Sequence, residues 1–375
     1  MNKQTKIITG VVVVAALLGG VTLYRSANTA NTIKIGVIAP LTGSGAGVYG
    51  EPLKKGIDLA VGEINKTAKT PYEVVYEDYQ LDPKLALSAY QKLKAEGVKY
   101  FVFNGTPADV TVGPEIKKDG NIAIDPSSLT PAYNDGSPLT CRIALTATNY
   151  GPQWAELVAN TLGKKKVVIL FPEYDAGIAM KDAFKKEFEA KGGQIVGEEK
   201  YLKDATDFKS QITKLKANKD ADVIVTINYF KSADTMLKQM KELGLNKTIV
   251  TDNWTINNAA LVSKDNVNGA YFVDYKYSLD SANTDQTTKD FITAFQGAYN
   301  AQPGLQSAQG YNIARIVTSA LEDQKKDPSA VSQFMIANMR DYKIVGGTIS
   351  FNNDCEVERD TAWRRIEQGR VMDVN

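Results

Sequence analysis

From Thr32 onward, short runs rich in valine and isoleucine alternate with longer segments whose apolar residues recur with a helical period. This alternation predicts parallel βαβ units, because parallel strands need a crossover connection that is usually a helix. The first cycle predicts a strand over 33–39, a helix over 49–65 and a strand over 73–76. The chain is therefore predicted to be an α/β protein whose central strands are buried on both faces.

The α/β pattern restarts after a predicted connecting strand over 139–145. With 375 residues the chain is also longer than a single hydrophobic core usually supports, so two lobes are predicted. From residue 270 the remaining segment is too small for a third domain, and it ends in a hairpin-like pair over 348–351 and 361–366. We therefore expect the chain to recross between the lobes. The expected first lobe comprises 32–145 plus about 274–345, and the second comprises 146–273 plus about 346–375.

The N-terminal 31 residues depart from this globular pattern. Lys3 and Lys6 precede an apolar or small stretch over 7–23, which polar residues then follow. This layout is typical of a secretory signal. The stretch would span roughly 26 Å as a helix, against about 30 Å for a bilayer core, so both a cleaved signal peptide and a retained membrane anchor stay open. The rest of the chain is expected to be extracytoplasmic, with membrane contact only through this segment.

The composition excludes several classes of function. Lys plus Arg (44) nearly equals Asp plus Glu (43), so the basic surface that a nucleic-acid partner requires is not expected. The chain has no histidine, which removes the commonest general base and metal ligand. We therefore expect no enzyme activity, no metal and no cofactor.

Gly45 to Gly50 match the dinucleotide-binding pattern GxGxxG between a predicted strand and a predicted helix. In that fingerprint the first glycine directly follows the strand, whereas five residues, 40–44, intervene here. A loop that enters a helix is the favoured interpretation. Its glycines would let the polar end of a small ligand approach backbone N–H groups.

Polar and aromatic segments follow the predicted strands of both lobes. Ligands of open α/β sheets bind outside the carboxyl ends of the strands, so these segments predict a cleft for a polar small molecule. The six segments are 42–50, 104–106, 125–130, 172–175, 228–230 and 252–254.

Cys141 and Cys355 are the two cysteines of the chain. An even count in an exported protein makes a disulfide between them a reasonable prediction, and two separate buried thiols are the alternative.

The motifs Ile35-Gly36-Val37, Pro40-Leu41-Thr42-Gly43 and Asp82-Pro83 resemble those of the Leu/Ile/Val-binding proteins of ABC transporters. The resemblance covers nearly everything after the N-terminal segment. It implies two flavodoxin-like, Rossmann-like lobes with parallel central sheets, joined by a three-crossover hinge that closes on a ligand. It also implies the function of a solute-binding protein that passes an amino-acid-like ligand to the membrane subunits of an ABC permease. A ligand-sensing receptor ectodomain of the same fold is the alternative.

The resemblance also implies roles for individual residues. Thr106 matches a family serine that holds the ligand carboxylate, and Ser127 and Ser128 match the backbone pair after the fourth strand. Tyr49 and Tyr229 match aromatic residues that cover the ligand. Leu129 stands where the family has a threonine, with Thr130 adjacent, and the acid for a ligand ammonium falls at Asp252 or Asn253. Tyr174 completes the expected ligand-binding set.

Overall fold

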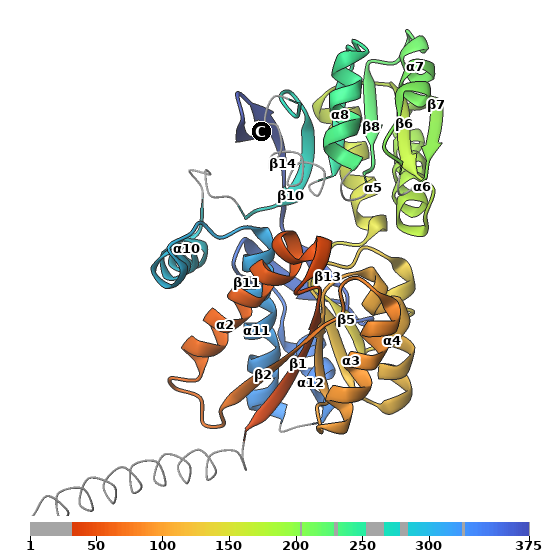
Figure 1. Cartoon of the computed structure of the whole chain (residues 1–375). Coiled ribbons are helices and arrows are strands. Elements are labelled where there is room, and N and C mark those ends of the chain that lie inside the picture. The colour runs from red at the N-terminus through yellow and green to blue at the C-terminus, as the bar shows by residue number, and fades with distance from the viewer. Residues whose placement is uncertain are drawn as a thin grey trace, which may run out of the picture.

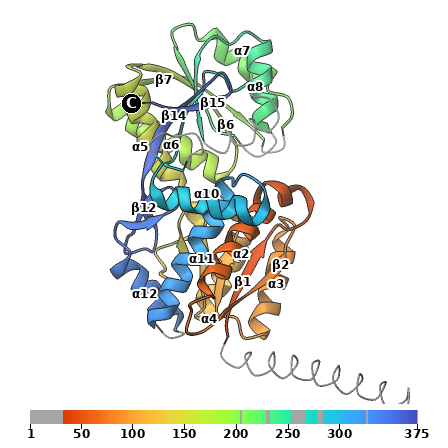
Figure 2. The same ribbon diagram turned by 90° about the vertical axis from the view of Figure 1, so that its left-hand side faces the viewer.

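The computed structural model of the protein describes residues 32–202, 205–228, 232–252, 266–277, 284–324 and 327–374. It consists of two lobes, one above the other, each built around a twisted sheet with helices on its faces (Figures 1 and 2). The expected N-terminal signal or anchor and Tyr229 lie outside the described residues. Among the helices that the structure describes, none has the length and apolar character needed to cross a bilayer.

The first lobe contains a sheet of five parallel strands in the order β2-β1-β3-β4-β5. This is the flavodoxin-like order, as predicted. The strands are β1 (Ile33–Ala39), β2 (Tyr72–Asp78), β3 (Tyr100–Phe103), β4 (Ile122–Asp125) and β5 (Thr140–Arg142). The helices of this lobe are η2 (Gly43–Gly45), η3 (Ala46–Gly50), α2 (Glu51–Ile64), α3 (Pro83–Ala95), α4 (Thr106–Asp119), η4 (Pro131–Tyr133), α10 (Gln286–Tyr299), α11 (Leu305–Gln324) and α12 (Pro328–Asn338).

The second lobe repeats the parallel order as β7-β6-β8-β9-β10 and extends it with antiparallel strands β14 and β15. The strands are β6 (Lys166–Pro172), β7 (Gln194–Tyr201), β8 (Val223–Thr226), β9 (Thr248–Asp252), β10 (Tyr271–Tyr275), β14 (Thr361–Glu367) and β15 (Arg370–Asp373). The helices are α5 (Ala147–Glu156), η5 (Leu157–Thr161), α6 (Asp175–Ala190), α7 (Lys209–Ala217) and α8 (Ser232–Glu242).

The C-terminal strands differ from the sequence prediction. The segments 348–351 and 361–366 do not pair with each other. The first pairs with residues 357–359, and the second pairs with β10 in the sheet of the second lobe. A separate antiparallel sheet is formed by β11 (Tyr342–Ile344), β12 (Gly347–Phe351) and β13 (Val357–Arg359). This sheet belongs to the first lobe, where β12 lies against α12. The last crossing between the lobes therefore falls between β13 and β14, rather than near residue 346.

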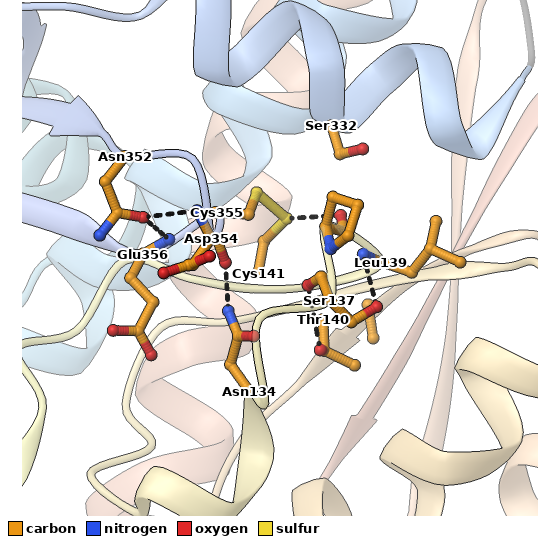
Figure 3. Close-up of a disulfide and its surroundings, with 12 residues drawn as sticks. Asn134, Ser137, Leu139, Thr140, Cys141, Ser332, Asn352, Asp354, Cys355 and Glu356 are labelled. Carbon is orange, nitrogen blue, oxygen red and sulfur yellow. Dashed lines mark hydrogen bonds between the residues drawn. A yellow bond between two sulfur atoms is a disulfide. The ribbon is translucent and has the colours of Figure 1, made fainter.

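A disulfide between Cys141 and Cys355 attaches this small sheet to the first lobe (Figure 3). The Cα atoms of the two cysteines are 4.8 Å apart, within the range that a disulfide requires. The Arg142 N–H also donates to the Cys355 carbonyl at 3.1 Å. The edge of β5 is thus covered by the loop between β12 and β13 instead of being left open.

Glycines allow one pair of helices in each lobe to pack closely. A Cβ atom at Gly310 of α11 would lie 2.2 Å from the Leu53 carbonyl oxygen of α2. In the second lobe, a Cβ atom at Gly151 of α5 would lie 2.5 Å from the Ala183 side chain of α6. Neither contact leaves room for a larger residue.

The three crossings between the lobes converge on Arg359, at the end of β13. Its Nη1 donates to the Ile143 carbonyl of the first crossing at 3.1 Å and to Gln309 Oε1 at 2.9 Å. The guanidinium also lies 3.7 Å from the ring centroid of Tyr275, where the second crossing begins. The Tyr275 hydroxyl in turn accepts the Leu145 N–H at 3.1 Å. One buried arginine therefore contacts all three connections.

Candidate functional site

A cavity of about 390 Å³ lies between the lobes, at the carboxyl ends of both parallel sheets. This interlobe cavity has the size of an ordinary small-molecule site. The described residues that line it are Tyr49, Leu81, Pro83, Asn104, Gly105, Thr106, Pro107, Val110, Thr111, Ser127 and Leu129 in the first lobe, and Tyr174, Ala176, Met180, Asn228 and Asp252 in the second. Both lobes therefore contribute to one binding surface.

Thr106 lies on the cavity wall at the start of α4, directly after β3. Gly105 precedes it with φ of +115°, a conformation that glycine adopts without strain and that turns the chain from strand into helix. The Gly105 N–H donates to Asp125 Oδ2 at 3.0 Å. At Thr106 the hydroxyl and the backbone N–H lie at the N-terminus of the helix, where a bound anion is favoured.

The loop after β4 is organised by Asp125. One of its carboxylate oxygens, Oδ1, accepts the N–H groups of Ser127 and Ser128, each at 2.5 Å, and the Ser127 hydroxyl at 3.2 Å. The sequence prediction assigned these two N–H groups to a ligand, but in the structure they already bind Asp125. An aspartate two residues before a turn commonly accepts such bonds, so the residue type at 125 was the signal that the prediction overlooked.

The five predicted residues Tyr49, Thr106, Ser127, Tyr174 and Asp252 line the cavity, but Ser128 and Thr130 do not. Ser128 is buried next to Asp109. Thr130 is buried too, and its hydroxyl accepts the Ala132 N–H at 3.3 Å as the cap of η4. Leu129 lies between these two and faces the cavity, as the alternation of an extended segment requires.

Two buried side chains hold the loop after β4 in place from the side away from the cavity. Arg142 donates to the Thr130 carbonyl at 2.8 Å and forms an ion pair with Glu356 at 2.7 Å. Gln309, which contacts Arg359 at the crossings, donates to the Pro126 carbonyl at 2.8 Å. The loop after β4 is therefore held on several sides before any ligand binds, which lowers the entropic cost of binding.

Asn104 is a cavity residue that the sequence prediction did not select. Its Nδ2 donates to Ser127 Oγ at 2.9 Å and to Gln306 Oε1 at 3.3 Å. Its Oδ1 is buried and has no hydrogen-bond partner among the described residues. A buried polar atom of this kind normally finds a partner, so Asn104 is a candidate contact for a polar group of the ligand.

The second lobe contributes the acidic side chain of the cavity. The Asn228 N–H donates to Asp252 Oδ2 at 3.2 Å, and the Asn228 side chain donates to Thr226 Oγ1 at 3.1 Å. Asp252 is 2% exposed at the end of β9. Tyr174, at the start of α6, also lies on the cavity wall. Asp252 is therefore the one ionisable carboxyl group among the described cavity residues.

Apolar side chains cover much of the cavity wall. Val110 follows Thr106 by four residues on α4, and Met180 follows Ala176 by four on α6. Residues four apart share one face of a helix, so this spacing could have identified both side chains from the sequence. Together with Leu81 they provide a surface for an apolar part of a ligand.

The glycine-rich segment that resembles a dinucleotide fingerprint has a packing role at Gly50. A Cβ atom at Gly50 would lie 2.1 Å from the Pro40 carbonyl oxygen, so this glycine lets η3 lie against the end of the preceding segment. Tyr49 extends from this turn to the cavity. The described residues contain no cluster of three or more acidic or cysteine side chains that could hold a metal.

Comparisons with known proteins agree with this architecture. Residues 32–370 match the periplasmic binding protein family. The Leu/Ile/Val-binding protein BraC3 of Rhizobium johnstonii is 27% identical over 80% of this chain and 86% of its own.

Two solved structures are similar to the whole described body. One is the branched-chain amino acid transporter substrate binding protein LivJ of Streptococcus pneumoniae in complex with isoleucine, with a TM-score of 0.79, 24% identity and coverage of 91% of this chain and 97% of that one. The other is a solute binding protein of an ABC transporter from Rhodopseudomonas palustris, in complex with 3,4-dihydroxybenzoic acid, with a TM-score of 0.79, 23% identity and coverage of 92% and 96%. At this identity both establish the fold. The chain belongs to the periplasmic binding protein family that includes the Leu/Ile/Val-binding proteins.

Proposed function

We propose that this protein is the extracytoplasmic solute-binding component of an ABC transporter, and that it captures a small amino-acid-like ligand between its lobes. The observation that carries the proposal is the interlobe cavity, which is lined by the carboxyl-end loops of both sheets. A ligand that touches both lobes stabilises the closed arrangement only, so capture and closure are linked. Family membership supports the same function.

The proposed ligand is a carboxylate attached to an apolar body. The isoleucine and dihydroxybenzoic acid bound by the two similar structures both have this character. In this chain the carboxylate is assigned to the first lobe, at the Thr106 hydroxyl and the start of α4. Leu81, Val110 and Met180 would contact the apolar part, and Asp252 would accept an ammonium group if the ligand has one.

Tyr49 and Tyr174 are proposed to cover the ligand from the first and second lobes. Tyr229 is proposed for the same role next to Asn228. The Ser127 hydroxyl already accepts from Asn104 and donates to Asp125, so it is a secondary contact in this proposal.

A thermal-shift screen tests the ligand class. Branched-chain amino acids, other amino acids and aromatic carboxylates are each added in excess to the protein. A ligand at 100 times its Kd should add about 2.7 kcal/mol to the free energy of unfolding. If no compound of these classes raises Tm, the proposed ligand class is wrong.

Calorimetry on Thr106→Val tests the placement of the carboxylate. The change keeps the shape of the side chain and removes the hydroxyl, so the binding free energy should fall by about 1.5–3 kcal/mol, the value for a hydrogen bond to a charged group. Thr293→Val, on the exposed face of α10, is the matched control. Unchanged affinity of Thr106→Val would refute this placement.

Delivery to a permease has its own test. Ligand uptake is measured in host cells that lack this protein, before and after the gene is restored. Restored uptake supports the transport role, and uptake that never depends on the protein contradicts it. Mass spectrometry of the native protein shows whether the N-terminal segment remains attached.

A further inference from the structure

Two carboxyl groups lie buried behind the first-lobe wall of the interlobe cavity. Asp109 belongs to the first turns of α4 and Asp125 ends β4, and both side chains are 0% exposed. Neither residue lines the cavity. The two are close enough to interact through a side-chain hydrogen bond.

The donors around Asp125 suit an ionised carboxylate. It accepts the N–H groups of Gly105, Ser127 and Ser128, which come from the loops after β3 and β4. An ionised carboxylate has only acceptor sites, and three backbone donors compensate for much of its lost hydration. Burial raises the pKa of Asp125, and these backbone hydrogen bonds oppose that increase.

Asp109 has the opposite surroundings. Among the residues that the structure describes, the Ser128 hydroxyl is the one neutral side-chain donor beside it, and this contact partly opposes the increase in the pKa of Asp109. No backbone N–H among the described residues donates to either oxygen of Asp109. Burial is the main reason that the pKa of Asp109 lies well above its ordinary range, and the negative charge of Asp125 raises it further. A protonated Asp109 can donate its O–H to Asp125, which satisfies both groups at once.

Other charged or titratable groups face the pair from the neighbouring elements. Arg142 of β5 partly opposes the increase in the pKa of Asp109, but it is itself paired with Glu356. Tyr133 of η4 donates its hydroxyl to the Ala123 carbonyl at 3.0 Å, so that proton does not serve the pair.

We propose that Asp109 and Asp125 form a positioning pair that shares one buried proton and thereby joins the loops after β3 and β4 into a single ligand-binding wall. This inference rests on the proposed function, because the wall is the one assigned to the ligand carboxylate. When the proton is lost, two buried carboxylates face each other. Their repulsion separates the loops and weakens both the fold and ligand binding. Ligand affinity therefore depends on a proton that does not itself contact the ligand.

Unfolding without ligand tests the shared proton. Urea midpoints are measured from pH 4.5 to 9 for the wild type, Asp109→Asn and the control Glu115→Gln, which changes a more exposed carboxyl on the same helix. The folded protein keeps a proton on Asp109 that the unfolded chain loses above the ordinary value of 3.8. The stability of the wild type must therefore decline with rising pH relative to Asp109→Asn. Parallel curves for these two proteins would overturn the proposal.

Ligand binding tests the positioning role, using the compound found in the screen. Asp109→Val removes the donor to Asp125, and affinity should fall tenfold or more. Asp109→Asn restores a donor, so it should recover most of that loss and should not show the decline of affinity with rising pH expected for the wild type. If Asp109→Asn binds as poorly as Asp109→Val, the donor role is wrong.

The two measurements separate the proposals from each other. If no ligand is found, the proposed function fails, but the unfolding curves still decide whether the pair holds a proton. If a ligand binds and the unfolding curves are parallel, the function stands and the shared proton is wrong. Should Asp109→Val not fold, the comparison of wild type with Asp109→Asn still decides the outcome.

Discussion

The two lobes have the same parallel strand order but hold their halves of the site in different ways. In the first lobe, the loops at the cavity are fixed by buried charged groups, Asp125 and Arg142, and by the nearby disulfide. In the second lobe, the ends of β8 and β9 are joined by the hydroxyls of Thr226 and Thr251 and by one hydrogen bond from the Asn228 N–H to Asp252. A shared sheet topology therefore does not determine how a binding surface is supported.

The C-terminal segment accounts for part of this difference. Its first half forms the small sheet whose loop between β12 and β13 covers β5, and its second half extends the second sheet through β14 and β15. The edge of the first sheet is thus secured by a covalent bond, and the edge of the second sheet by backbone hydrogen bonds to added strands. We expect the first lobe to respond more strongly to redox conditions and pH.

Removal of the disulfide should have the largest effect. The bond links residues 214 positions apart. Replacing both Cys141 and Cys355 by Ala should lower the free energy of unfolding by about 4 kcal/mol, because the unfolded chain gains conformational entropy when the cross-link is removed. Circular dichroism follows the helices and strands of both lobes. First-lobe unfolding at lower urea is expected. If the urea midpoint measured by circular dichroism is unchanged, the disulfide does not contribute to the difference between the two lobes.

The close helix contacts should affect both lobes alike. Gly310→Ala and Gly151→Ala each place a Cβ atom where no space exists, and each should cost about 3 kcal/mol, the upper range for overpacking. Gly62→Ala on α2 is the control, because nothing lies within 4 Å of its Cβ position and helix propensity should add roughly 0.5–1 kcal/mol. If only one of the two tight positions is sensitive, the lobes differ in packing as well as in polar support.

The hydroxyl pair of the second lobe should give a smaller effect that does not vary with pH. Thr251 donates to the Thr226 carbonyl at 3.0 Å, and Thr251→Val removes this bond and one partner of Asn228. The expected loss is about 1.5 kcal/mol in urea unfolding. Because no charge is involved, the loss should be equal at pH 5 and pH 8. A loss that changes with pH would show that Asp252 is coupled to this pair.

The smallest effect is expected at the loops after the first strand of each lobe. Asp78 accepts the Leu41 N–H at 2.9 Å and the Thr42 hydroxyl. Burial acts to raise the pKa of Asp78, but these hydrogen bonds outweigh it and the pKa is lowered. Their contribution is therefore present above the ordinary value of 3.8 and is lost as the pH falls through the lower folded value.

Asp78→Asn should lower stability at pH 7 by about 0.5 kcal/mol, because the group is partly exposed to solvent. In the second lobe the loop after β6 carries Glu173, whose ion pair with Lys200 of β7 is exposed. Glu173→Gln should have no measurable effect. Equal losses for the two variants, measured by urea unfolding, would contradict the difference in support at these loops.

Much of the fold could be predicted from local patterns, because buried parallel strands and amphipathic helices each have a distinct period. The predicted pairing of 348–351 with 361–366 was wrong, because strand partners depend on contacts distant in sequence. Thr106 was predicted to lie at the cleft because it directly follows a predicted strand, and in the structure it lines the cavity. The engagement of the Ser127 and Ser128 N–H groups by Asp125 depends on loop geometry, which the period of a sequence does not encode.

The convergence of the three crossings on Arg359 limits the freedom of the lobes. Two bodies joined by separate tethers can slide, twist or swing relative to one another. Sliding would pull the Tyr275 ring of the second lobe away from the guanidinium, whereas a rotation centred on Arg359 leaves this contact in place. We therefore expect the three crossings to act together as one hinge centred on Arg359. Each cavity residue would then move in proportion to its distance from Arg359. A small rotation there would therefore open the mouth of the cavity more than its interior.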